Sequence, residues 1–99
     1  MKKLVRNKIP YLLKHVGTRH STKKLRGEKF KEALHVKLHE EWEEFWETPN
    51  EEEMADCLQV LQDAARAYGI EWEKVKVARS AKAEDKGDFS GALEVTFHD

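Results

Sequence analysis

The short break at residues 48–50 is the feature that most constrains the fold of this chain. On either side of it, residues 28–47 and 51–68 repeat apolar side chains at the spacing of an amphipathic helix. Pro49 disfavours helix at the residue before it, and Asn50 is a residue type that commonly caps a new helix. A connection of so few residues predicts that the two helices form an antiparallel hairpin.

The rest of the chain predicts shorter elements around this hairpin. Pro10 suits the first turn of a short helix that Asn7 could cap and Gly17 could end. Gly87 is expected to stop a third helix, beyond which the residues alternate between apolar and polar. The expected elements are the short helix over 8–15, a basic loop over 17–27, the third helix over 71–85 and a short strand or extended arm over 92–97.

Length and composition predict one small all-α domain over residues 1–99. An apolar content of 39% and a charged content of 37% leave this chain a modest core. We therefore expect oligomerisation, as a homodimer or homotetramer, to complete it. The single cysteine, Cys57, excludes an intramolecular disulfide and favours a reducing, cytoplasmic location. The sequence contains no apolar run of about 18 residues, so we predict no membrane span.

Four carboxylates fall where the helical pattern places apolar residues. Glu41 lies in the middle of the apolar stripe of the first long helix, and Glu44 lies one helical step further round. Glu53 falls inside the apolar arc of the second long helix, and Asp56 lies at its edge. Burying unpaired carboxylates is costly, and a bound cation would offset that cost.

An all-carboxylate set favours Mg²⁺, with Mn²⁺ as the other candidate, over Zn²⁺. His35 and His39 have the spacing of a zinc pair, but they project away from Glu41, so a zinc site there is disfavoured. The helical wheel alone leaves open a different interpretation, in which the glutamate-rich face is simply exposed to water.

The order of several short motifs resembles a known family. Glu40-Glu41-x-x-Glu44 followed by Glu53-x-x-Asp56 resembles the signature of the MazG-type all-α nucleotide pyrophosphohydrolases. Further blocks, in the same order along most of the chain, are similar to a phosphoribosyl-ATP pyrophosphohydrolase-like subgroup: KLVRNKIP at 3–10, LHEEWEEF at 38–45, ADCLQV at 55–60 and KGDFSG at 86–91. Asn7 and Asp88 depart from that subgroup, which usually has Asp and Gly at these two positions.

The resemblance implies an enzyme that cleaves a nucleoside triphosphate into a monophosphate and pyrophosphate. It also implies that Mg²⁺ is held by Glu41, Glu44, Glu53 and Asp56. We expect Glu40 and Glu41 to act in catalysis, Glu41 by holding the cation and Glu40 by orienting or deprotonating the attacking water.

Three other functions fit the same residues. They are a related enzyme acting on a phosphoribosyl nucleotide, a catalytically silent helical module that binds a nucleotide or a protein, and a small nucleic-acid binder. The last is disfavoured because residues 32–73 carry thirteen acids and two bases, and this acidic centre would repel nucleic-acid phosphates.

Basic residues toward both ends of the chain predict a clamp for the substrate phosphates. Arg6 and Lys8 lie in the N-terminal motif, within a segment, residues 1–31, that carries eleven Lys/Arg and one acid. On the third helix, Arg79, Lys82 and Lys86 continue a stripe whose apolar half should pack on the hairpin. Solubilising charges that pair with the acidic centre are the alternative interpretation.

Two tryptophans predict an additional contact surface. Trp42 and Trp46 flank the main apolar stripe of the first long helix. We favour an oligomer interface for them over a wall that stacks on a nucleotide base, because aromatic residues are common at interfaces. Cys57 lies on an apolar face and is expected to pack there.

Overall fold

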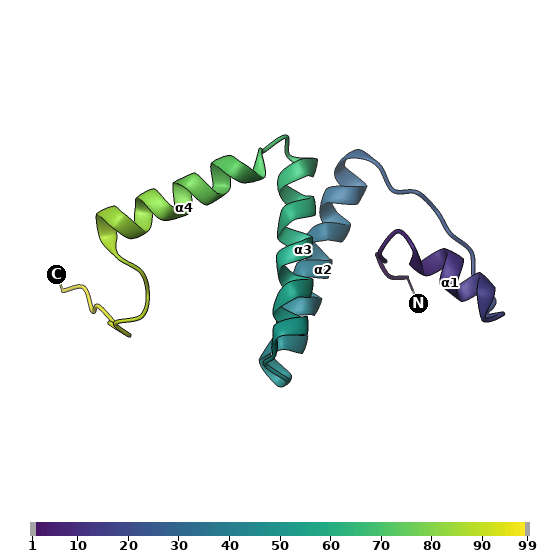
Figure 1. Cartoon of the computed structure of the whole chain (residues 1–99), viewed down its shortest axis with the longest axis horizontal. Helices are drawn as coiled ribbons and strands as arrows, with labels where there is room; N and C mark the ends of the chain where they lie inside the picture. Colours follow the sequence, from purple (N-terminus) through teal and green to yellow (C-terminus); the bar gives the residue numbers. More distant parts are fainter. Residues whose placement is uncertain (1, 99) are drawn as a thin grey trace. The chain divides into compact units, whose positions relative to one another are not determined.

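The all-α prediction is confirmed in a computed structural model that describes residues 2–98. These residues form four helices and no strand (Figure 1). The helices are α1 (Ile9–His15), α2 (Gly27–Glu47), α3 (Glu51–Ala67) and α4 (Trp72–Lys86). Residues 93–98 have no regular structure, so the strand alternative for the C-terminal segment was wrong. No helix within the described residues combines the length and the apolar character that crossing a membrane would need.

The predicted hairpin is present, and α2 and α3 pack against each other along their length (Figure 1). Thr48 ends α2, and Asn50 caps α3 by accepting a hydrogen bond of 2.8 Å from the backbone N–H of Glu53. The cap satisfies one of the free donors of the first turn of α3. It thereby fixes the turn that carries Glu53.

Loss of this cap should weaken the fold measurably. We expect Asn50→Ala to lower the free energy of unfolding by about 1 kcal/mol, because the N–H of Glu53 loses its acceptor. Asn50→Asp should stay close to the wild-type value, since its carboxylate can accept the same bond. Urea unfolding followed by circular dichroism measures both. Equal losses in the two variants would show that the cap does not stabilise α3.

The core of the hairpin is small. Its buried apolar residues are Leu34 from α2 and Cys57, Val60 and Ala65 from α3. Other apolar residues of the two helices stay about half exposed, among them Met54 and Leu58. A stable helical bundle covers such residues with further helices, but a hairpin of two helices leaves them exposed.

The described residues divide into two compact units, one ending at Gly69 and the other starting at Ile70. Gly69 has a backbone φ of +71°, the left-handed conformation that ends many helices and that glycine adopts without strain. The second unit holds α4, which contains no buried residue. The expected packing of the α4 stripe on the hairpin therefore stays a prediction.

Helix α1 begins differently from its prediction. Its N-cap is Lys8, which makes no capping hydrogen bond through its side chain, so the cap assigned to Asn7 was wrong. Pro10 does lie in the first turn, as expected, and no residue of α1 is buried. The helix therefore contributes nothing to the core that the structure describes.

Candidate metal centre

Glu41 is a buried carboxylate in the apolar interface of the hairpin, as the helical wheel predicts. The residue retains 7% of its accessible surface, a value comparable with the apolar core residues. One oxygen, Oε1, forms an ion pair of 3.1 Å with the Nζ of Lys37, which lies one turn earlier on α2. The other oxygen, Oε2, is buried and has no hydrogen-bond partner among the described residues. A buried carboxylate oxygen without a partner is energetically costly, and a bound cation would offset that cost.

Two carboxylates of α3 face Glu41. Glu53 and Asp56 are three residues apart on one face of α3. Ligand oxygens of Glu41, Glu53 and Asp56 all lie within 4.8 Å of one another. Glu53 Oε2 is also buried and without a partner among the residues described. We call these three residues the carboxylate triad.

Glu44, the fourth predicted ligand, lies on the exposed side of the triad. Its carboxylate is not part of the tight group, but the pKa of Glu44 is raised, first by the negative charge of Glu41 and to a smaller extent by that of Glu53. Like charges this close disfavour ionisation of one another. Glu44 therefore lies within the electrostatic field of the triad, and its role as a fourth ligand stays a prediction.

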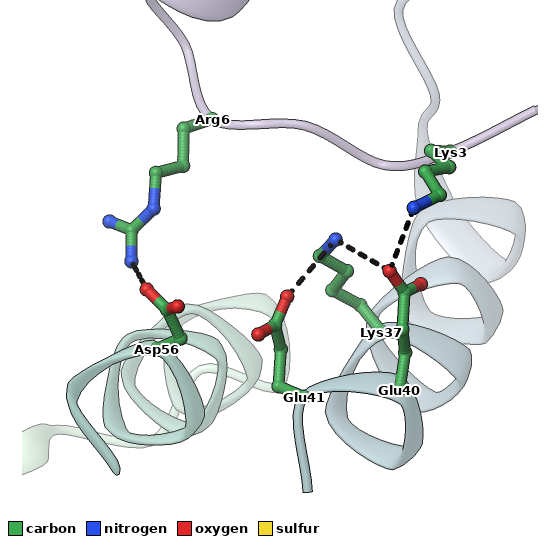
Figure 2. Close-up of polar contacts among 6 residues, drawn as sticks. All are labelled: Lys3, Arg6, Lys37, Glu40, Glu41 and Asp56. Carbon is green, nitrogen blue, oxygen red and sulfur yellow. Dashed lines mark hydrogen bonds and ion pairs between the residues drawn. The ribbon is translucent and has the colours of Figure 1, made fainter. Parts of the chain in front are cut away.

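Glu40 is held by two lysines. Its Oε1 lies 3.3 Å from the Nζ of Lys3 and 3.3 Å from the Nζ of Lys37 (Figure 2). The pKa of Glu40 is lowered, first by the hydrogen bond from Lys3 and then, against an opposing effect of burial, by that from Lys37. Glu40 is therefore an ionised group on the flank of the triad.

Lys37 is a site residue that our sequence reasoning missed. Burial by itself would lower the pKa of Lys37, but the bonds to Glu41 and Glu40 outweigh this effect and the pKa is raised. The lysine therefore keeps its charge and offsets part of the charge of the two glutamates. Its position three and four residues before Glu40 and Glu41 on one helix is the signal that could have identified it.

Arg6 is the predicted phosphate ligand that the structure places at the triad. Its Nη2 donates to Oδ1 of Asp56 at 2.6 Å, across fifty positions of the chain. Figure 2 shows the N-terminal segment passing over the carboxylates, with the side chains of Arg6 and Lys3 reaching toward Asp56 and Glu40. Sequence patterns contain no local signal for either contact. Lys8, the other N-terminal candidate, is exposed and forms no ion pair within the described part of the chain.

The remaining phosphate candidates belong to the second unit. Arg79, Lys82 and Lys86 are exposed residues of α4, and Arg79 donates to the hydroxyl of its neighbour Ser80 at 3.2 Å. Their expected place beside the carboxylates stays a prediction.

An apolar groove lies beside the triad on the same hairpin. Its lining is entirely apolar and consists of Leu38, Trp42, Met54, Cys57, Leu58 and Leu61. Trp42 stacks on Phe45 with ring centroids 5.3 Å apart, and Trp46, next to it, remains 72% exposed. The contact surface predicted at the two tryptophans is therefore available on this hairpin.

Cys57 lines the groove and directly follows Asp56 of the triad along α3. The thiol is buried, as expected, and its pKa is raised, first by burial and then by the charges of Glu41, Asp56 and Glu53. A raised pKa keeps the thiol protonated, so it is a poor nucleophile. The predicted packing role is confirmed. His35 and His39 are exposed and do not belong to the ligand group that the described residues form.

Comparisons with known proteins returned no matching family model, no similar curated protein and no similar solved structure. The resemblance to the pyrophosphohydrolases therefore rests on the motifs of the chain itself.

Proposed function

We propose that the protein is a metal-dependent nucleoside triphosphate pyrophosphohydrolase, releasing a nucleoside monophosphate and pyrophosphate. The observation that carries the proposal is the carboxylate triad with its two buried, unpartnered oxygens, Glu41 Oε2 and Glu53 Oε2. A solvated acidic face, the competing interpretation, would leave these oxygens in contact with water. The motif order described above supplies the reaction type.

The donor set fits a hard divalent cation. The triad offers carboxylate oxygens only, and Glu44 can add a fourth, which suits Mg²⁺ or Mn²⁺ better than Zn²⁺. A bound cation would supply two things to the reaction: neutralisation of the triphosphate charge and polarisation of the bonds to phosphorus.

The remaining work falls to side chains of this chain. Glu40 lies on the flank of the triad, where an ionised carboxylate can orient a water toward the α-phosphorus and accept its proton. Attack by that water breaks the bond between the α-phosphorus and the bridging oxygen, and pyrophosphate leaves with the bond electrons. We assign Arg6 and Lys8 to the charge of the triphosphate, as a forked and a point-charge donor. The same role for Arg79, Lys82 and Lys86 stays a prediction from the sequence.

Product analysis in ¹⁸O-labelled water tests the reaction. Purified protein is incubated with each common nucleoside triphosphate and Mg²⁺. The products are separated, and mass spectrometry identifies which of them carries the ¹⁸O label. Attack at the α-phosphorus places the label in the monophosphate and leaves pyrophosphate unlabelled. Labelled inorganic phosphate, or no product from any nucleotide with Mg²⁺ or Mn²⁺, would contradict the proposal. A phosphoribosyl nucleotide in the same panel separates the related enzyme from the proposed one.

A second candidate function is favoured by the exposed apolar groove. A silent helical module that binds a protein would use such a surface and would bind nucleotide, if at all, without turnover.

For the proposed enzyme we assign the groove to a second copy of the chain, because two hairpins joined there would form the four-helix bundle that the single hairpin lacks.

A charge in the groove should separate the copies. Leu58 is 46% exposed on the groove wall, and we expect Leu58→Asp to be monomeric at concentrations where the wild type is a dimer, because a carboxylate would be buried in an apolar contact. Size-exclusion chromatography with light scattering measures the mass. Val36→Asp is the matched control, since Val36 is exposed and lies on the opposite face of α2 from Leu34. An unchanged dimer mass in Leu58→Asp would place the contact between the copies elsewhere. A monomeric wild type would show that there is no such contact.

A further inference from the structure

The N-terminal arm, residues 2–8, is attached to the hairpin through charged side chains. The arm precedes the first turn of α1 and has no regular secondary structure over residues 2–6. Two ion pairs join it to the acidic site: Arg6 to Asp56 at 2.6 Å, and Lys3 to Glu40 at 3.3 Å (Figure 2). Arg6 thus neutralises a member of the carboxylate triad, and Lys3 neutralises the carboxylate beside it.

The contact of Arg6 competes with a metal ion in this geometry. A cation held by the triad would lie about 2 Å from an oxygen of Asp56, and the guanidinium lies 2.6 Å from Oδ1 of the same carboxylate. Two positive groups so close to one small carboxylate repel each other, and Asp56 cannot neutralise both.

The contact is also easily exchanged. The side chains of Arg6 and Asp56 keep 58% and 38% of their accessible surface, so water and salt weaken the attraction between them. The triad oxygens Glu41 Oε2 and Glu53 Oε2, by contrast, are buried and receive nothing from the arm. The arm therefore covers the site without satisfying its deepest ligands.

We propose that the arm is a built-in cation that neutralises Asp56 in the metal-free protein and is released when a divalent cation binds the triad. Arg6 is then a positioning residue for Asp56 in the metal-free state, and its guanidinium becomes available to an anionic phosphate only after the metal has entered. This inference rests on the proposed metal site and predicts an order of binding in which the cation precedes the nucleotide.

Calorimetric titration with Mn²⁺ alone tests the competition. We expect Arg6→Ala to bind Mn²⁺ about threefold to tenfold more tightly than wild type, because the cation no longer displaces an ion pair. Arg19→Ala is the matched control: it removes the same charge from an exposed residue that forms no ion pair in the described part of the chain, and its affinity should stay within about twofold of wild type. Lys3→Ala and the exposed Lys2→Ala form a second such pair.

Nuclear magnetic resonance supplies a readout that a general effect of charge would not move. The ¹⁵N heteronuclear Overhauser effect reports backbone motion on the picosecond to nanosecond scale. We expect its values over residues 3–6 to fall when diamagnetic Mg²⁺ is added to the wild type, and to be low already in Arg6→Ala.

Three results would overturn the inference. Wild type that binds Mn²⁺ as tightly as Arg6→Ala, or more tightly, would remove the competition and leave the metal site intact. Arm relaxation unchanged by saturating Mg²⁺ would show that the arm stays in place. Absence of Mn²⁺ binding in both proteins would overturn the metal site itself and this inference with it.

Discussion

Glu41→Gln should lower metal-dependent pyrophosphate release by at least about a hundredfold, the largest effect on activity that we expect from one substitution. Glu41 is the buried member of the triad, and its Oε2 has no partner among the described residues. A neutral amide of the same size keeps the volume and can still accept a bond from Lys37, but it removes the charge that a divalent cation requires. The rate of pyrophosphate release at saturating Mg²⁺ measures the change.

Glu43→Gln is the matched control for this effect. Glu43 is two residues away on the same helix, is exposed and forms no ion pair in the part of the chain that the structure describes. Its substitution changes the net charge by the same amount, and activity should remain within about twofold of wild type. Circular dichroism confirms that both variants fold. Equal activity in Glu41→Gln and Glu43→Gln would mean that the triad has no part in the reaction.

Leu34→Ala should be the most destabilising single substitution in the hairpin. Leu34 keeps 4% of its accessible surface and is the buried apolar residue that α2 contributes to the core. Truncation of a buried leucine typically costs about 2–5 kcal/mol through lost transfer energy and the cavity left behind. Because a small domain is stable by only about 5–15 kcal/mol, the variant should unfold at a clearly lower urea concentration, as followed by tryptophan fluorescence.

Val36→Ala gives the comparison for this loss. Val36 is 64% exposed on the same helix, so its truncation should change the free energy of unfolding by less than about 0.5 kcal/mol. Similar midpoints for the two alanine variants would show that α2 does not pack through Leu34. A large loss in Leu34→Ala with metal binding retained would show that packing and the carboxylate triad can be separated.

Features that depend on neighbouring residues were predictable from the sequence. The cap at Asn50 formed as expected, and the burial of Glu41 followed from helical spacing. The meeting of Glu41 with Glu53 and Asp56 followed from the short connection, because a hairpin brings together the turns on either side of its bend.

Features that depend on distant parts of the chain were not predictable in this way. The pairing of Arg6 with Asp56 joins an irregular segment to a helix, and no periodicity encodes it.

Two local features were also missed. Asn7 was assigned as a cap from residue type alone, but the chain turns at Lys8 and the backbone of Arg6 accepts the bond from Ile9 instead. Lys37 could have been identified from its spacing, since it lies one turn before Glu41 on the same helix.

Titration of Mn²⁺ into the wild type, Glu41→Gln and Glu43→Gln would show whether the triad holds a cation, and it does not require that the substrate be known. We expect saturable binding to the wild type that Glu41→Gln loses and Glu43→Gln retains. Absence of saturable binding to the wild type, or equal binding to all three proteins, would contradict a metal site at the triad and would identify the acidic helices as a charged surface.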